Sequence, residues 1–450
     1  MPEDSTKKIL GSVAISDQTI EDFQKSAKNI GGFKNIIEKT ISKSTTDLVD
    51  MILFGSIELD VSDIHLEPQE DKAKLRVRLD GILQDVVFFE QNVYRSLLSR
   101  LKLLSKLKLN ITDKPQDGRF SIEVNKTLVE IRTSSLPAEY GESVVLRILN
   151  PKNLIDLGDL GLREDLYKIF RKEIQKPNGM IIVTGPTGSG KTTTLYAFLK
   201  KIQNPEVKII TIEDPIEYHL KGISQTQVSP EKGYTFADGL KSIVRQDPDV
   251  ILVGEIRDLE TAKISLQAAL TGHLVLSTLH TNDAAGTIPR LVDLGTDSSS
   301  IAPALKMAVA QRLVRKVCKK CSTLENPKPE ELAEIKKGLK SLSLKSKIKL
   351  PNIDKIKVAR IKKEGCEACN FTGFKGRQGL FEAFLVDSEI EKFILTNPPV
   401  SSIRELAIKK GMVTMYQSGL LDVIEGKTTL DEIKRIVEED EFFENSKPED

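Results

Sequence analysis

The chain has 450 residues, of which 39% are hydrophobic and 29% are charged, and this length predicts about two or three domains with buried cores. Its 66 basic and 65 acidic residues give a net charge of +1, so the composition provides no bulk attraction toward nucleic acid or an anionic membrane. No apolar run approaches the roughly 18 residues of a membrane span, and the N-terminus lacks the basic and apolar regions of a signal peptide. These features predict a cytoplasmic protein.

The first third of the chain predicts a small α+β domain. Residues 1–44 are polar and weakly patterned, which indicates a short, partly disordered lead. Alternation predicts strands and apolar spacing predicts helices beyond it, with helices near 41–59 and 97–107 and strands near 73–79, 120–124, 128–133 and 144–149. We therefore place an α+β domain at 45–150 and a linker at 151–160.

The next region, 161–316, alternates helical and strand patterns, as parallel α/β sheets do. Strands are expected at 180–183, 208–212, 249–253 and 274–278. The last three run into polar residues that include Glu217, Glu255 and His280. Because ligands of such sheets bind at the carboxyl ends of the strands, we expect these side chains to converge.

The strand at 180–183 leads directly into a phosphate-binding motif. Residues 185–192 match G-x-x-x-x-G-K-[ST] at every fixed position, and a helical pattern follows. The glycines let backbone N–H groups face phosphate oxygens, and the helix N-terminus adds partial positive charge. The predicted nucleotide-binding residues are Gly185, Pro186, Thr187, Gly188, Ser189, Gly190, Lys191, Thr192 and Thr193. Lys191 is expected to reach the β- and γ-phosphates, and Thr192 to bind Mg²⁺.

Side chains at the other strand ends are candidates for the remaining chemistry of phosphoryl transfer. Glu255 occupies the place of a Mg²⁺-binding carboxylate, although the usual acid there is Asp. Glu217 is the candidate to orient or deprotonate an attacking water, and His280 to sense the γ-phosphate. Each has a structural alternative: a solvated acid at a strand end, or a lone histidine with no ligand.

All four cysteines of the chain lie in two C-x-x-C pairs, formed by Cys318, Cys321, Cys366 and Cys369. Complete pairing in a cytoplasmic protein predicts a tetrahedral Zn²⁺ site in an insertion at 317–376. A zinc ribbon that binds nucleic acid is the alternative, but the stretch between the pairs has no aromatic residue for base stacking. Beyond it, 377–437 predicts helices, and 438–450 is an acidic tail expected to be disordered.

Several of these motifs together resemble a known family. The motifs are Ser62-Asp63-Ile64-His65-Leu66-Glu67-Pro68, Pro115-Gln116-Asp117-Gly118-Arg119, the acidic stretch 212–218, the Gly-Glu stretch 253–258 and the histidine-containing stretch 271–282. Over residues 45–436 the chain resembles the hexameric ATPases of type II secretion and type IV pilus assembly. The four cysteines are similar to those of assembly and secretion motors, whereas retraction motors usually lack them.

The resemblance implies a RecA-like ATPase domain with a smaller, PAS-like N-terminal domain, and it implies ATP, Mg²⁺ and Zn²⁺ as cofactors. Glu217 would be the general base and Glu255 would support Mg²⁺. Arg119 and Arg132 would come from the small domain toward the phosphates, and Arg245 is a further basic position. One turn before Arg245 the family usually has Arg, where this chain has Lys241. His273 and His280 would couple nucleotide state to conformation.

The function that the resemblance implies is a cytoplasmic homo-hexameric motor, peripheral to the inner membrane and without direct nucleic-acid binding. It would act on an inner-membrane platform protein that adds pilin subunits to a pilus or to a secretion pseudopilus. Residues 1–44 are too few for the larger N-terminal module common in the family. The alternatives are a related traffic ATPase for DNA uptake or conjugation, an ATP-gated scaffold without useful turnover, and a zinc-ribbon nucleic-acid binder.

Overall fold

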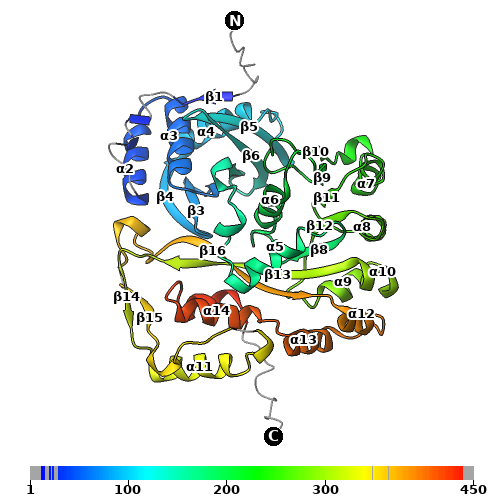
Figure 1. Cartoon of the computed structure of the whole chain (residues 1–450). Coiled ribbons are helices and arrows are strands. Elements are labelled where there is room, and N and C mark those ends of the chain that lie inside the picture. Colours follow the sequence, from blue (N-terminus) through cyan, green and yellow to red (C-terminus); the bar gives the residue numbers. More distant parts are fainter. Residues whose placement is uncertain are drawn as a thin grey trace, which may run out of the picture. The chain divides into compact units, whose positions relative to one another are not determined.

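The computed structural model of the chain describes residues 12–15, 20–21, 23–24, 29–346, 348–362 and 364–438 (Figure 1). Two compact units are present. The first unit comprises 1–153, 318–321 and 362–375, and the second comprises 154–317, 322–361 and 376–450. Within the predicted lead, residues 1–11, 16–19, 22 and 25–28 lie outside the described residues, whereas residues 30–40 form a helix. The tail beyond Glu438, also predicted to be disordered, lies entirely outside them.

The first unit is built on a seven-stranded sheet in the order β1-β5-β6-β7-β2-β3-β4. Its strands are β1 (Ser12–Ala14), β2 (Asp63–Pro68), β3 (Lys72–Leu79), β4 (Ile82–Glu90), β5 (Gln116–Val124), β6 (Thr127–Ala138) and β7 (Gly141–Leu149). Strands β2 to β7 pair antiparallel, and the buried residues of β3 alternate with partly exposed ones. The strand predictions for this region are therefore confirmed.

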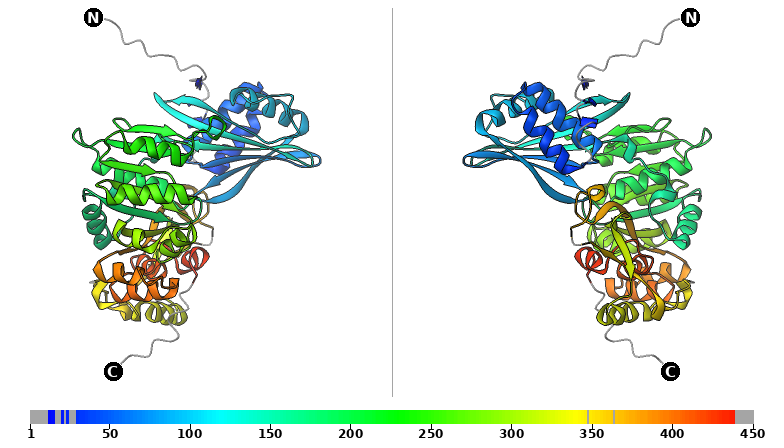
Figure 2. Two further views of the ribbon diagram at one scale, coloured as in Figure 1. Left: turned by 90° about the vertical axis from the view of Figure 1, so that its right-hand side faces the viewer. Right: turned by 90° about the vertical axis from the view of Figure 1, so that its left-hand side faces the viewer.

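Among the helices that the structure describes in full, α2 (Ile30–Thr40), α3 (Thr45–Glu58) and α4 (Gln91–Leu104) cover one face of this sheet (Figure 2). The pattern of α3 predicted an amphipathic helix, but residues 48–57 of α3 are all buried. This happens because α3 packs against both α2 and α4, so few of its positions face solvent.

The second unit contains a seven-stranded sheet in the order β10-β9-β11-β12-β8-β13-β16. Its strands are β8 (Gly179–Thr184), β9 (Ile209–Glu213), β10 (Ser224–Gln227), β11 (Val250–Val253), β12 (Leu274–Leu279), β13 (Leu305–Val317) and β16 (Phe374–Leu385). Neighbouring strands from β10 through β13 are parallel. Met180 and Ile182 of β8 enter one apolar core and Ile181 and Val183 the other, so the sheet is buried on both faces.

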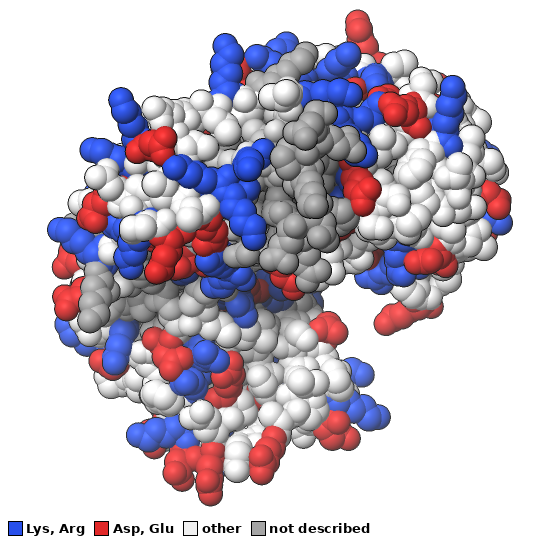
Figure 3. Space-filling view, turned by 90° about the horizontal axis from the view of Figure 1, so that it is seen from below, with Lys and Arg blue, Asp and Glu red and all other residues white. Residues whose placement is uncertain are grey.

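Six helices of the second unit connect or flank these strands: α5 (Glu164–Glu173), α6 (Lys191–Ile202), α7 (Phe236–Val244), α8 (Leu259–Leu270), α9 (Thr287–Asp293) and α10 (Ser298–Ala304). The alternation predicted for 161–316 is thus confirmed. No helix in the described part of the chain has both the length and the apolar character needed to cross a membrane. Basic and acidic side chains both occur on the face shown in Figure 3.

The remainder of the second unit is mainly helical. Strands β14 (Ser322–Glu325) and β15 (Val358–Ile361) form a two-stranded antiparallel sheet. Helix α11 (Pro329–Lys340) lies between them in the chain. The helices that follow are α12 (Ser388–Ile394), α13 (Val400–Lys409), α14 (Met415–Ile424) and α15 (Leu430–Ile436). The stretch predicted as helical from 377 begins instead within strand β16. Its apolar run is short, and such a run does not distinguish a buried strand from a buried helix.

Candidate nucleotide site and metal centre

The loop between β8 and α6 has a backbone that glycine alone adopts readily. Gly185, Gly188 and Gly190 have φ values of 145°, 79° and 88°. A Cβ on Gly185 would lie 2.5 Å from the carbonyl oxygen of Gln311, and one on Gly190 would lie 2.8 Å from the Gln311 side-chain nitrogen. The hydroxyl of Ser189 in this loop is buried and has no hydrogen-bond partner among the described residues. The loop thus leaves a polar atom free, as a site for an anion does.

Lys191, the first residue of α6, is folded back on this loop. Its ammonium group donates hydrogen bonds to the carbonyl oxygens of Gly185 at 2.7 Å and Pro186 at 3.0 Å. Burial lowers the pKa of Lys191 to about 8, Glu255 opposes this shift, and Arg312 adds to it. These two carbonyl groups are neutral, whereas a phosphate is negatively charged. A bound phosphate would therefore stabilise the Lys191 ammonium group more strongly than they do.

The carboxyl ends of β11 and β12 bring two predicted residues together beside Lys191. The Glu255 carboxylate lies 3.4 Å from Nε2 of His280 and 2.5 Å from the guanidinium of Arg257. Burial lowers the pKa of His280, and the nearby Lys191 lowers it further, which outweighs the attraction of Glu255. His280 is therefore a neutral imidazole at pH 7, able to donate or accept a hydrogen bond. The structure thus brings two of the three expected side chains, Glu255 and His280, together near the loop.

The loop after β9 carries Glu217, whose side chain is half-buried and whose backbone forms a hydrogen bond with Tyr196. The residue that fixes this loop is Glu213, which the sequence analysis did not select. Its buried carboxylate accepts hydrogen bonds from Tyr196 of α6, from Thr211 at 2.5 Å and from Gln225 at 3.2 Å. Gln225 also donates to the carbonyl oxygen of Tyr218. The signal in the sequence was an acid within an otherwise apolar strand.

Two residues of β13 that the sequence analysis also missed lie against the phosphate loop. The buried side chain of Gln311 accepts a hydrogen bond from Thr194 of α6 at 2.7 Å. The guanidinium of Arg312 donates to the carbonyl oxygen of Asn282 at 2.8 Å, and burial lowers its pKa. No local motif reveals this pair, because its position depends on the register of β13 beside β8.

Other predicted residues of the second unit lie apart from this cluster. Arg245 is exposed at the end of α7 and contacts the hydroxyl of Ser242 at 3.4 Å, whereas Lys241 pairs with Glu260. Arg245 precedes β11, so it lies at the amino edge of the sheet, opposite the phosphate loop. His273 lies at the same edge, where its Nδ1 contacts the carbonyl oxygen of Ala268 at 2.9 Å.

The two predicted arginines of the first unit belong to a row of three. Arg119 on β5 pairs with Arg132 on β6, which pairs in turn with Arg147 on β7. Arg119 is exposed, Arg132 lies 3.4 Å from Glu130, and Arg147 lies 2.9 Å from Asp63. Like charges directly opposite one another destabilise a sheet. A bound anion would offset the repulsion between these arginines, so the row is suited to bind one. Arg147 has no local signal in the sequence, since strand register is not visible there.

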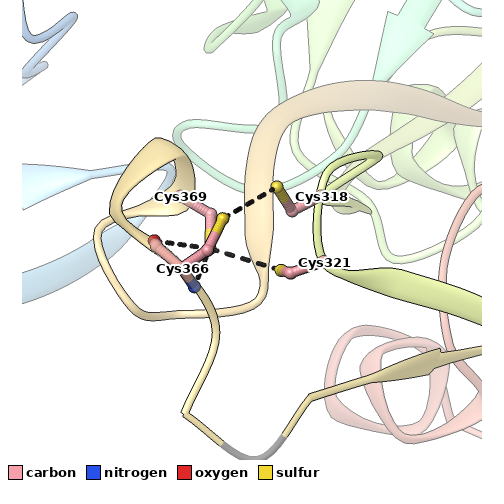
Figure 4. A group of neighbouring side chains, drawn as sticks. All are labelled: Cys318, Cys321, Cys366 and Cys369. Atoms are coloured by element: carbon pink, nitrogen blue, oxygen red, sulfur yellow. Dashed lines mark hydrogen bonds between the residues drawn. The ribbon is translucent and has the colours of Figure 1, made fainter.

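The four cysteines gather at one point of the first unit (Figure 4). Their sulfur atoms all lie within 4.8 Å of one another. The contacts Cys318–Cys366 and Cys321–Cys369 are 3.8 Å, and Cys366–Cys369 is 3.7 Å. Four thiolates bound to zinc at about 2.3 Å in a tetrahedron would be roughly 3.8 Å apart, so the geometry fits this ion. The quartet is therefore a candidate metal site.

Backbone groups of this cluster favour a thiolate at Cys369. Burial raises the pKa of Cys369, but N–H groups of Cys366 and Gly373, both 3.2 Å from its sulfur, together with the thiols of Cys366 and Cys321, lower it to about 7. Burial and hydrogen bonds with the other three thiols raise the pKa of Cys321 to about 12, so Cys369 is the thiol that ionises more readily. The segment also holds the start of α2, because Asn370 accepts a hydrogen bond from the N–H group of Ile30 at 2.7 Å. The site thus joins distant parts of the chain within the first unit.

Comparison with known proteins places this geometry in a family. The profile of the family described as Type II/IV secretion system protein matches residues 38–435. The chain is 41% identical over 393 residues to the Type II secretion system protein E of Xanthomonas campestris, covering 87% of this chain and 67% of that protein. It is 42% identical over 376 residues to the Type IV pilus assembly ATPase PilB of Thermus thermophilus, covering 83% of this chain and 41% of PilB.

A solved structure agrees with these matches. The pilus retraction motor PilT, solved with bound ADP, is similar to this chain with a TM-score of 0.59 and 27% sequence identity, over 88% of this chain and 98% of that one. The expected resemblance is therefore confirmed: this chain belongs to the type II secretion and type IV pilus-assembly ATPase family.

Proposed function

We propose that the chain is an ATP-hydrolysing motor that powers the assembly of a type IV pilus or of a type II secretion pseudopilus. The observation that carries this proposal is the convergence of Lys191, Glu255 and His280 on a glycine-rich phosphate loop. The names of its relatives, which are secretion and pilus-assembly proteins, support the cellular process. The retraction motor PilT was solved with ADP, which supports an adenine nucleotide as ligand.

The proposed roles follow from the chemistry of each side chain. Lys191 leaves its two carbonyl partners and binds the β- and γ-phosphates. Thr192 and Glu255 are the residues that would hold Mg²⁺, which when bound neutralises charge on the phosphates. Glu217 orients the attacking water and takes its proton, so that water adds to the γ-phosphorus and ADP leaves. The neutral His280 senses the γ-phosphate through a hydrogen bond.

Arginines complete the site in this proposal. Arg119 and Arg132 of the first unit stabilise negative charge that develops on the phosphates, as an arginine finger does. Arg245 lies at the opposite sheet edge from the phosphate loop of its own chain, and we assign it to the site of a neighbouring subunit in a homo-hexamer. Lys241, already paired with Glu260, supplies charge there without the bidentate geometry of arginine.

The proposed setting is the cytoplasmic face of the inner membrane, where the hexamer would act on a platform protein. In that setting Zn²⁺ binds the four cysteines as a structural ion and stabilises the first unit. Metal analysis of the purified chain should then find one zinc per chain, and Cys321→Ser should lose it. An unchanged zinc content in Cys321→Ser would contradict this part of the proposal.

The test of the central claim is Lys191→Ala. Steady-state phosphate release by the hexamer should fall to background, because both the nucleotide and its transition state lose their main cation. Lys263→Ala, on the exposed side of α8, is the matched control and should keep its turnover. Turnover by Lys191→Ala equal to that of the unsubstituted chain would overturn the assignment.

A further inference from the structure

Four consecutive residues after His280 are each tied to a different element of the second unit. The N–H group of Thr281 donates to the hydroxyl of Thr184, the residue before the phosphate loop, at 2.7 Å. The carbonyl oxygen of Asn282 accepts from Arg312 of β13. Asp283 lies 3.8 Å from Arg404 of α13, and Ala284 donates to Glu382 of β16 at 3.0 Å. We call residues 281–284 the junction segment.

The side chain of Glu382 forms hydrogen bonds with both the junction segment and the C-terminal helix α14. Its carboxylate is fully buried, and while one oxygen accepts from the N–H group of Ala284, the other accepts from that of Met415 at 2.9 Å. Met415 is the first residue of α14, whose N-terminus favours a negative charge. The one carboxylate thus links the junction segment to a helix more than a hundred residues later.

We propose that Glu382 is a positioning residue that couples the nucleotide state of the phosphate loop to the C-terminal helices through the junction segment. The proposal rests on the proposed function, because it requires ATP to bind beside Thr184 and His280. Both N–H groups are buried against Glu382, so a shift of the junction segment either carries α14 with it or leaves a buried donor unpaired. Packed interiors resist such gaps, which makes movement of the helix the favoured response.

The direction of the coupling follows from the order of the contacts. A γ-phosphate that draws His280 toward it displaces Thr281, which is hydrogen-bonded to Thr184, the residue before the phosphate loop. The displacement passes to Ala284 and then, through the two oxygens of Glu382, to Met415. Arg404, which reaches Asp283 from α13, provides a second and weaker link because its contact is longer.

The test compares Glu382→Gln with Asp422→Asn as a matched control. The Gln side chain keeps the shape but accepts only one of the two N–H bonds. Asp422 on α14 accepts a hydrogen bond from Gln378 at 2.7 Å, so the control weakens the same helix against the strand β16 without touching the junction segment. The measurements are the affinity for a non-hydrolysable ATP analogue, the steady-state kcat, and hydrogen exchange of residues 415–418 with and without that analogue.

We expect the analogue to slow exchange at 415–418 in the unsubstituted chain and in Asp422→Asn, and to have no such effect in Glu382→Gln. Glu382→Gln should bind the analogue within about twofold of the unsubstituted chain while its kcat falls about tenfold. Equal behaviour of the two variants, or exchange at 415–418 that never responds to the analogue, overturns the coupling and leaves the proposed function intact. Absence of analogue binding by the unsubstituted chain overturns the proposed function itself.

Discussion

The two seven-stranded sheets of this protein display their functional residues in different ways. In the parallel sheet of the second unit, both faces are buried, and the polar residues of interest follow the last residue of a strand, as Glu255 and His280 do. In the first unit, whose strands β2 to β7 pair antiparallel, Arg119, Arg132 and Arg147 occur within strands, and pairing aligns them in a row. A parallel sheet thus concentrates chemistry at one edge, whereas an antiparallel sheet spreads charge across a face.

The largest effect should come from the edge of the parallel sheet. Glu217→Gln removes the proposed base and keeps its shape, so we expect kcat to fall by about 100-fold or more with little change in ATP affinity. Phosphate release and equilibrium ATP binding measure the two quantities. Glu206→Gln, an exposed acid before β9, is the control and should keep its turnover. A kcat of Glu217→Gln near that of the unsubstituted chain would assign the proton transfer to another group.

The next largest effect on kcat is expected from the arginine row of the first unit. Here the sign of the accompanying change in stability is informative. Arg119→Gln should lower kcat by roughly 100-fold if this side chain meets the phosphates. The same change removes a like charge opposite Arg132, so it should raise the free energy of unfolding of the first unit by about 0.2 to 1 kcal/mol. Turnover and urea unfolding measure the two effects. Loss of both activity and stability would indicate that Arg119 is structural.

The phosphate loop also predicts a pH dependence of ATP binding. Burial lowers the pKa of Lys191 to about 8 in the empty site, and bound phosphate would raise it, so binding requires the protonated form. Affinity should be constant below pH 8 and fall by up to about tenfold for each pH unit above it. Binding titrations from pH 7 to 9.5 test this. His280→Gln should show the same dependence, since the pKa of His280 lies below that range. A flat profile would show that Lys191 stays charged.

The same contrast explains what the sequence could predict. The phosphate loop, Glu255 and His280 were found because each lies within a local pattern of strand and following residues. The cysteine quartet was found because two C-x-x-C turns identify the ligands without any knowledge of the fold. Arg147, Arg312 and Glu382 were missed, because their partners come from strand register or from contacts across thirty or more residues. Position along the chain does not carry that information.

The smallest expected effect is a change in the free energy of unfolding, and it concerns Asp50 on one of the helices that cover the sheet of the first unit. Asp50 on α3 is 7% exposed, and burial raises its pKa to about 6, with Arg100 opposing the shift and Asp47 adding to it. Its unfolded value is near 3.8, so the folded state favours the protonated form. At a pH below both pKa values, Asp50 is protonated in the folded and the unfolded state and does not change the free energy of unfolding. As the pH rises from about 4 to about 6, ionisation is favoured in the unfolded state, so the free energy of unfolding falls.

Asp50→Asn imitates the protonated form at every pH. We therefore expect it to be more stable than the unsubstituted chain by about 1 to 2 kcal/mol at pH 8, and by less at pH 5. Urea unfolding at the two pH values measures the difference. Glu58→Gln, an exposed acid at the end of the same helix, is the control and should change little at either pH. A variant that is less stable than the unsubstituted chain at pH 8 would mean that the Asp50 charge is stabilised by Arg100 more strongly than burial opposes it.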